Sequence, residues 1–148
     1  MRDRIVAHGV DALRAFTAYA EQAGMTREGA FGFVDVGYSG TMQTAIQTAL
    51  GRPLIGLYMG VSHAAAQVRA GGGHAFGAFA DGDVGSFTGG FGLMLEAFLT
   101  APHGQVIGYD DSVQPVVPRF RHDGMSQQLF PTLERIYRGV EDLSLIHI

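Results

Sequence analysis

The segment 31–61 constrains the fold more than any other part of the chain. It reads as a strand, a glycine-rich loop, a helix, a turn and a second strand, at residues 31–36, 37–41, 42–50, 51–53 and 54–59. Both strand runs are apolar, and the helix carries apolar residues at intervals of three and four. Because only a three-residue turn joins the helix to the second strand, the segment predicts a right-handed parallel crossover.

The flanking sequence adds helices and two further extended segments. Apolar residues recur at helical spacing over 3–22, 91–100 and 129–140, and residues 105–109 read as a strand. Two prolines restrict residues 113–120 to an edge strand or an extended segment. The glycine-rich stretch 60–90 reads mainly as loop, with one helical turn possible at 64–70. We therefore predict an α/β fold, a Rossmann-like three-layer fragment with a mostly parallel sheet.

Composition excludes several classes of protein. The 148 residues are 47% hydrophobic and 16% charged, as in a folded globular domain. The net charge of −4 comes without a basic stripe, so we expect no nucleic-acid partner. Without cysteine there is no disulfide scaffold and no thiolate metal site. No apolar run approaches the ~18 residues of a membrane span, which predicts a soluble, cytoplasmic protein.

The two ends of the chain indicate a fragment. Residues 143–148 read Leu-Ser-Leu-Ile-His-Ile, the translation of a sequencing-library adaptor, although a natural apolar tail is the alternative. The first residues open almost directly onto a helix with no preceding strand. We therefore expect one α/β domain over 1–142 that belongs to a longer protein, followed by an adaptor-derived tail at 143–148.

The loop at 37–41 is the part of the sequence that points to chemistry. A small-residue loop between a parallel strand and a helix presents free backbone N–H groups at the positive end of the helix dipole, where anions bind. Ser39 and Thr41 could contact a phosphate or cap the helix, and one geometry serves both roles. Gly37 and Gly40 would allow close backbone approach. Asp35 could bind a sugar hydroxyl or a metal, or accept hydrogen bonds from its own loop.

Three motifs occur in order along the chain. They are Val-Asp-Val-Gly-Tyr-Ser-Gly-Thr-Met-Gln at 34–43, Ile-Gly-Leu-Tyr-Met-Gly at 55–60, and Leu-Glu-Ala-Phe-Leu-Thr-Ala-Pro-His-Gly at 95–104 followed by Gly-Tyr at 108–109. Together they resemble a segment that follows the hydrolase domain in bacterial haloacid-dehalogenase-superfamily proteins of polysaccharide clusters. Tyr38 stands where that family usually has tryptophan. The Asp-x-Asp segment of the hydrolase itself is absent, so aspartyl-phosphate chemistry is not predicted for this chain.

The resemblance implies a set of site residues. Asp35, Glu96 and His103 are the implied catalytic residues. The implied ligand-binding residues are Gly37, Tyr38, Ser39, Gly40, Thr41, Gln43 and Tyr109. Glu96 has the alternative of a solvated helix face, and His103 that of a surface turn. Gln43, on the first helical turn, could face either the ligand or solvent.

Two weaker resemblances lead to the same loop. The order of strand, Asp, Tyr-Ser, helix, Arg-Pro and strand looks like the donor-nucleotide half of GT-B glycosyl- and glycerophosphotransferases. Val34-Asp35 with Ser39-Gly40-Thr41 looks like a phosphoribosyltransferase loop that lacks the usual second acid. We therefore expect an accessory or transferase-like domain of surface-polysaccharide biosynthesis that binds a phosphorylated or nucleotide-activated sugar at 37–41. The alternatives are a structural domain that docks a neighbouring hydrolase domain and a phosphoribosyltransferase-like enzyme.

Other polar residues give weaker signals. His63, His74, Asp81 and Asp83 do not follow a metal-ligand spacing, so we predict no metal site and no cofactor. Arg52 and Arg69 could clamp a phosphate or lie on the surface. The neighbouring domains of the same longer chain are the expected protein partners.

Overall fold

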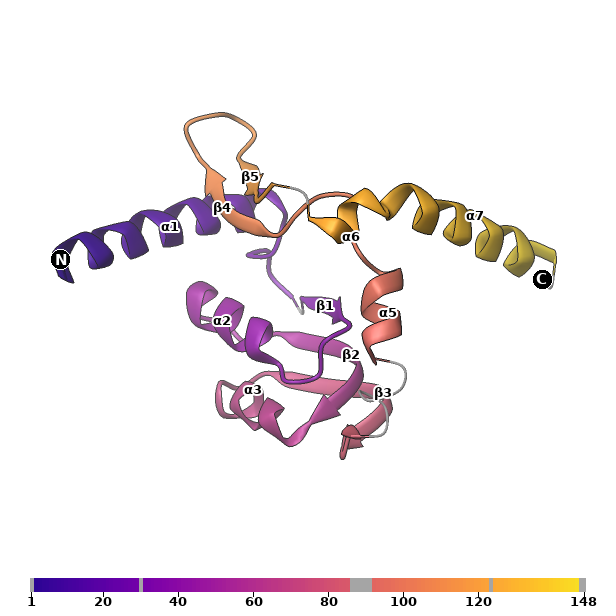
Figure 1. Cartoon of the computed structure of the whole chain (residues 1–148). Coiled ribbons are helices and arrows are strands. Elements are labelled where there is room, and N and C mark those ends of the chain that lie inside the picture. Colours follow the sequence, from indigo (N-terminus) through magenta and orange to yellow (C-terminus); the bar gives the residue numbers. More distant parts are fainter. Residues whose placement is uncertain (1, 30, 86–91, 123, 147–148) are drawn as a thin grey trace.

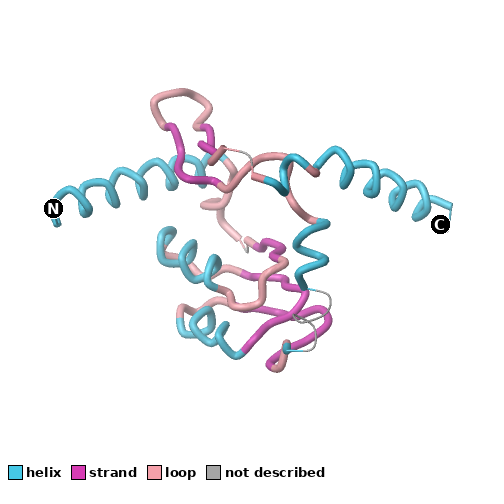
Figure 2. The backbone as a smooth tube through the Cα atoms, in the orientation of Figure 1, coloured by secondary structure: helices cyan, strands magenta, loops and turns pink. Residues whose placement is uncertain are grey.

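The computed structural model describes residues 2–29, 31–85, 92–122 and 124–146 (Figure 1). The helices are α1 (Arg2–Gln22), α2 (Thr41–Leu50), α3 (Ala66–Ala70) preceded by the 3-10 turn η1 (His63–Ala65), α5 (Leu93–Phe98), α6 (Met125–Gln128) and α7 (Phe130–Ile146). The strands are β1 (Gly32–Asp35), β2 (Ile55–Ser62), β3 (His74–Gly82), β4 (Val106–Asp110) and β5 (Val117–Phe120). Figure 2 shows how helices and strands alternate through the first half of the chain.

The main sheet is entirely parallel and follows the order β1-β2-β3. Gly32 lies opposite Ile55, and Ile55 lies opposite His74, so neighbouring strands in the sheet are also neighbours along the chain. Helix α2 connects the first two strands, and η1 with α3 connects the next two. This arrangement confirms the predicted α/β class and the Rossmann-like parallel sheet.

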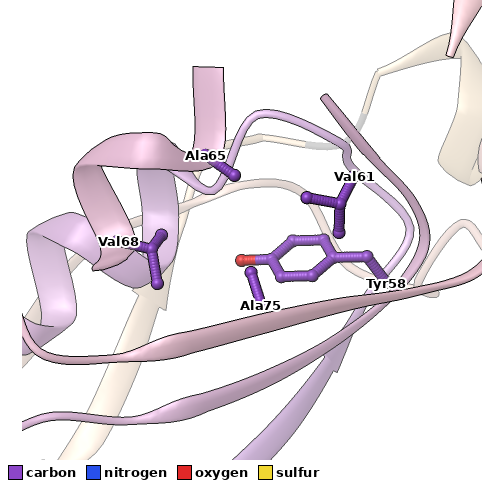
Figure 3. Packing of buried hydrophobic residues seen from close by; sticks show 5 residues of the cluster. All are labelled: Tyr58, Val61, Ala65, Val68 and Ala75. Carbon is purple, nitrogen blue, oxygen red and sulfur yellow. The ribbon is translucent and has the colours of Figure 1, made fainter. Parts of the chain in front are cut away.

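The core lies between the sheet and helices α2 and α3 (Figure 3). Its buried apolar members are Tyr58, Val61, Ala65, Val68 and Ala75. Phe33 of β1 packs against this cluster, with its ring edge-on to Tyr58 at 6.1 Å between centroids. The predicted fold has three layers. Within the described residues, α2 and α3 form a helical layer on one face of the sheet. The opposite face of the sheet exposes apolar side chains.

A buried polar network fastens α2 to the sheet. Gln43, which is 0% exposed, donates from Nε2 to the carbonyl oxygens of Leu54 (2.9 Å) and His74 (3.0 Å) and to Oε1 of Gln47 (3.2 Å). The hydroxyl of Tyr58 donates to Gln43 Oε1 at 2.9 Å. Since buried polar groups cost free energy unless they are bonded, this network fixes the position of the helix.

The prediction of loop for the glycine-rich stretch is wrong at His74–Gly82, which forms strand β3. A Cβ added at Gly77 would lie 2.0 Å from the carbonyl oxygen of Ala80, so this glycine allows the irregular pairing near Tyr58 and Gly60. The glycines here therefore serve close backbone approach within a strand. Gly89 and Gly90, also predicted as loop, lie outside the described residues.

The second sheet is the antiparallel pair β4–β5, which packs on α1. The ring of Tyr109 lies 4.6 Å from that of Tyr19 and 5.7 Å from that of Phe16. Gln22 closes the contact, because its amide exchanges two hydrogen bonds with the backbone of Val116. The predicted edge strand at 113–120 is thus present at Val117–Phe120.

The last helix continues into the suspected tail. α7 ends at Ile146, so residues 143–146 extend the helix, and 147–148 lie outside the described residues. Among the described residues, no helix combines the length and the apolar character that crossing a bilayer requires.

Candidate functional site

The candidate site lies where β1 ends and α2 begins. Asp35 is the last residue of β1, and its Oδ1 accepts a hydrogen bond of 2.8 Å from the Gly37 amide. This bond uses the Gly37 amide and one oxygen of the Asp35 carboxylate. It is the hydrogen bond from its own loop that the sequence analysis gave as one alternative for Asp35. In open parallel sheets, ligands bind at the carboxyl ends of the strands. The second carboxylate oxygen therefore sits at the edge where a ligand would bind.

Helix α2 begins without a side-chain cap. Gly40 is the N-cap residue, in the left-handed conformation with φ of 69°, and no side chain bonds to the first turn. Thr41 and Met42 are both exposed, and among the described residues no acceptor pairs with their backbone N–H groups. Ser39 and Thr41 place their hydroxyl oxygens 2.9 Å apart beside this helix end. The arrangement therefore offers two amides and two hydroxyls to an anion.

Packing against α3 explains why Gly40 stands at this position. A Cβ on Gly40 would lie 2.6 Å from Cγ2 of Val68 and 3.4 Å from Cβ of Ala65. The positive φ independently favours glycine. On the other side of the loop, the Ser62 amide donates to the Tyr38 carbonyl at 2.8 Å, which ties the loop to the end of β2. The Tyr38 side chain stays 43% exposed, where it can form one wall of a site.

Gln43 lies behind the loop and not on its surface. Its side chain is fully buried, and both polar atoms are bonded to protein groups. Its partner Tyr58 is 2% exposed, and burial, together with the charge of Asp35, raises the pKa of Tyr58 to about 12. Tyr58 therefore stays protonated at neutral pH and keeps donating to Gln43. In this geometry Gln43 holds α2 in place, and the ligand contact expected from the resemblance is not formed by its side chain.

The other implied catalytic residues lie on separate elements. Glu96 is an exposed residue of α5, which agrees with the solvated-face alternative. His103 precedes β4, and its ring packs on Phe120 with 4.0 Å between centroids. Within the described part of the chain, no hydrogen bond or ion pair joins Asp35, Glu96 and His103 to one another. Their convergence on a single ligand stays a prediction.

Tyr109 lines a different hollow, between α1 and the β4–β5 hairpin. This cavity, of about 330 Å³, is walled by charged groups that include Arg14, Asp110 and Arg119. Hydrogen bonds from Ser112 hold the pKa of the Asp110 carboxyl below its usual range, and Arg119 adds to the effect. Burial raises the pKa of Tyr109. The cavity is not lined by residues 37–41, so Tyr109 and the loop do not share it.

Two further residues lie at the same sheet edge, Ser62, which sequence reasoning missed, and His63, which it considered only as a metal ligand. Ser62 ends β2, and its hydroxyl accepts the Ala64 amide at 3.2 Å. His63 follows and is exposed, and its ring lies beside Gly82 at the end of β3, where an added Cβ would be 3.2 Å from Cε1. Ser62 ends a largely buried strand and His63 follows it, and a position at the end of such a strand is the signal that could have identified them.

The arginines and the suspected metal ligands have local partners. Arg52 donates to the backbone carbonyls of Met25, Arg27 and Gly29, so it pins the segment before β1. Arg69 lies 3.8 Å from Asp81 in an exposed ion pair. Over the described residues, no three His, Asp or Glu side chains are grouped to hold a metal ion.

Comparison with known proteins assigns the chain to no family. Searches of family models, of curated proteins and of solved structures give no significant match to this chain. The resemblance to the segment that follows bacterial haloacid-dehalogenase-type hydrolases therefore rests on the three ordered sequence motifs and stays a prediction.

Proposed function

We propose that the loop 37–41 and the start of α2 bind the phosphate group of a phosphorylated or nucleotide-activated sugar. The observation that carries the proposal is the uncapped first turn of α2 at the carboxyl edge of a parallel sheet. Thr41 and Met42 are exposed residues there, and no acceptor among the described residues pairs with their amides. Free amides at a helix start attract anions through hydrogen bonding and through the helix dipole.

Each neighbouring side chain has a role in this proposal. The Ser39 and Thr41 hydroxyls, already within 2.9 Å of each other, turn outward to donate to phosphate oxygens. The free carboxylate oxygen of Asp35 accepts a hydrogen bond from a sugar hydroxyl, while its other oxygen keeps the loop closed through Gly37. The exposed Tyr38 ring covers the sugar. Charge-assisted contacts of this kind contribute roughly 1.5–3 kcal/mol each.

In biological terms, the proposed role is that of an accessory or transferase-like domain in bacterial surface-polysaccharide biosynthesis, acting on such a sugar in the cytoplasm. The sequence motifs support the pathway class, and the geometry of the α2 start supports the phosphate. Transfer chemistry would also require an acid or base near the sugar, and Asp35 is the nearest carboxylate to the loop.

The test is a pair of glutamate substitutions on α2. Thr41→Glu places a carboxylate at the helix start, where it mimics the anion and stabilises the helix by about 0.3–1 kcal/mol. Thr48→Glu introduces the same charge at an exposed position near the helix end, where it is mildly unfavourable. We expect Thr41→Glu to raise Tm and abolish binding, and Thr48→Glu to lower Tm and leave binding intact.

Binding is measured by backbone amide shifts and calorimetry with sugar 1-phosphates and nucleoside-diphosphate sugars. The unphosphorylated sugars serve as negative controls. The proposal predicts shifts centred on Ser39, Gly40 and Thr41. It fails if these amides stay still while others move, or if Thr41→Glu binds as tightly as the unsubstituted protein.

A further inference from the structure

The cavity between α1 and the β4–β5 hairpin has the size and the lining of a small-molecule site. Its volume is about 330 Å³, and Figure 1 shows the hairpin beside the helix that forms the other wall. Ligand pockets in proteins measure about 300–1,000 Å³, so a small molecule fits. Small residues leave this room, because Ala12 and Ala15 line the helix wall and Gly108 lines the strand wall. The loop 37–41 does not line the cavity, so it is separate from the proposed phosphate site.

Carboxylates outnumber guanidinium groups among the described residues that line the cavity. Arg14 is shared by two acids, because its Nη1 lies 3.4 Å from Asp11 Oδ1 and its Nε lies 3.1 Å from Asp111 Oδ2. Asp110 adds a third carboxylate, and its Oδ1 accepts a hydrogen bond of 3.0 Å from the Ser112 amide. Over the described part of the chain, no group donates to the other carboxylate oxygen of Asp110, Oδ2. The cavity therefore carries excess negative charge and offers one free acceptor.

Arg119 lines the same cavity and forms no hydrogen bond or ion pair with the other described residues. It lies opposite Gly108 across the hairpin, and a Cβ on that glycine would be 2.9 Å from Nη2 of Arg119. The absence of a side chain at 108 therefore lets the guanidinium lie against β4. Asp110 is opposite Val117, and diagonal neighbours such as Asp110 and Arg119 are roughly 7–8 Å apart, within reach of long side chains. The free guanidinium and the free carboxylate oxygen thus border one small space.

We propose that this cavity binds the zwitterion of a free α-amino acid. The carboxylate of the ligand pairs with Arg119, because the planar fork of N–H donors on a guanidinium matches the two oxygens of a carboxylate. The ammonium group of the ligand donates to Oδ2 of Asp110. A simple anion would also face the three carboxylates of the lining, and a simple cation would leave Arg119 without an acceptor. A ligand that carries both charges satisfies both groups.

The first experiment compares ligands by calorimetry and backbone amide shifts. It is done at about pH 7.5, where imidazole groups are ordinarily neutral, because His8 also lines the cavity. L-alanine, L-leucine and L-glutamine share the zwitterion, whereas propionate and ethylamine each carry one of its charges. We expect at least one amino acid to bind and to shift the Gly108 and Asp110 amides, and propionate and ethylamine to bind roughly tenfold or more weakly. The proposal is wrong if no amino acid shifts these amides, or if either singly charged compound binds as tightly.

Two substitutions separate the roles of the charged groups. Arg119→Gln removes the partner of the ligand carboxylate, so amino-acid binding should fall roughly tenfold or more while ethylamine binding is kept. Asp110→Asn removes the partner of the ammonium group, so amino-acid binding should fall. Propionate should then bind more tightly than to the unsubstituted protein, because one negative charge is gone. Arg135→Gln, on α7 and outside the cavity lining, should change the binding of none of these ligands. Equal losses of every ligand in both cavity variants would indicate a structural effect and refute the assignment.

A cavity-filling variant covers the case in which a charge substitution disturbs the hairpin. Ala12 is an exposed residue of α1 in the cavity lining, and leucine, a good helix former, would occupy the space without removing a charge. We expect Ala12→Leu to keep the Tm of the unsubstituted protein and to abolish amino-acid binding. Its Ser39, Gly40 and Thr41 amides should respond to sugar phosphates as before, so failure of this proposal is distinguishable from failure of the phosphate site. Undiminished amino-acid binding by Ala12→Leu would overturn the proposal.

Discussion

Replacing Gln43 by leucine tests whether the buried amide network holds α2 on the sheet. Leucine keeps most of the side-chain volume but has no polar atom. The substitution removes the two N–H donors of Nε2, which three acceptor oxygens share, and the acceptor that Oε1 offers to Tyr58. The Leu54 carbonyl keeps another partner, because the His74 amide donates to it at 3.0 Å. The Tyr58 hydroxyl loses its acceptor inside the core.

The expected loss of unfolding free energy follows from these contacts. Each lost hydrogen bond costs about 0.5–1.5 kcal/mol net, and a buried hydroxyl left without an acceptor costs about 1–3 kcal/mol. The apolar leucine side chain offsets part of this cost, so we expect the free energy of unfolding to fall by roughly 3 kcal/mol. For a domain of this size, that corresponds to a fall in Tm of roughly 6–12 °C. Thermal and urea unfolding followed by circular dichroism measure both quantities.

The double variant with Tyr58→Phe decides whether the reasoning holds. Removing the hydroxyl from the unsubstituted protein leaves Gln43 Oε1 without its donor, whereas removing it from Gln43→Leu relieves a stranded group. Tyr58→Phe should therefore cost stability alone and restore about 1 kcal/mol in the leucine background. Strictly additive losses would refute the idea that the two side chains form one network.

The remaining predictions concern pH, glycine packing and the tail. Because the folded pKa of Tyr58 is raised to about 12 from 10, its contribution is fully present below pH 10 and is lost as pH rises from 10 through 12. This amounts to at most about 2–3 kcal/mol. The pKa of Tyr109 is also raised, so tyrosinate absorbance is compared with that of Tyr58→Phe, which should lack one late-titrating tyrosine. Identical titration curves for the two proteins would contradict the burial argument. Gly73→Ala should destabilise by roughly 2–4 kcal/mol in urea unfolding, because the new Cβ would lie 1.8 Å from Gln47 Oε1. Gly9→Ala, which meets no atom within 4 Å in α1, should stabilise by about 0.5–1 kcal/mol. Deleting 143–148 should leave Tm unchanged in a thermal melt, and a fall of several degrees would mean that the tail is packed.

Local sequence pattern predicted the first two strands of the main sheet well. The strand, loop, helix and strand at 31–59 appear as β1, α2 and β2, because apolar periodicity and the Gly-Arg-Pro turn all favour the same structure. Strand β3 was missed because glycine and alanine dominate its sequence. Its backbone is extended by pairing with β2, a long-range contact that no local pattern encodes.

For the candidate site, the sequence predicted the position of the loop and helix start but not which way each side chain faces. The loop and the helix start lie where the sequence placed them, at the carboxyl end of β1. Gln43 was assigned to the ligand because it belongs to the same motif, yet its amide turns inward to carbonyls of β3 and of the turn before β2. A motif records which residues recur together, and only the packing shows which of them face solvent.

The sequential order β1-β2-β3 also bears on how the chain acquires its structure. Each strand pairs with the strand just before or after it in the chain, and each closure in the main sheet spans a helical crossover. Between α2 and this sheet, the bond from the Gln43 amide to the His74 carbonyl at the start of β3 joins residues further apart in the sequence than the strand pairs do. During synthesis on the ribosome, α2 can bond to Leu54 and Tyr58 first and can complete its network only after the third strand has emerged and docked.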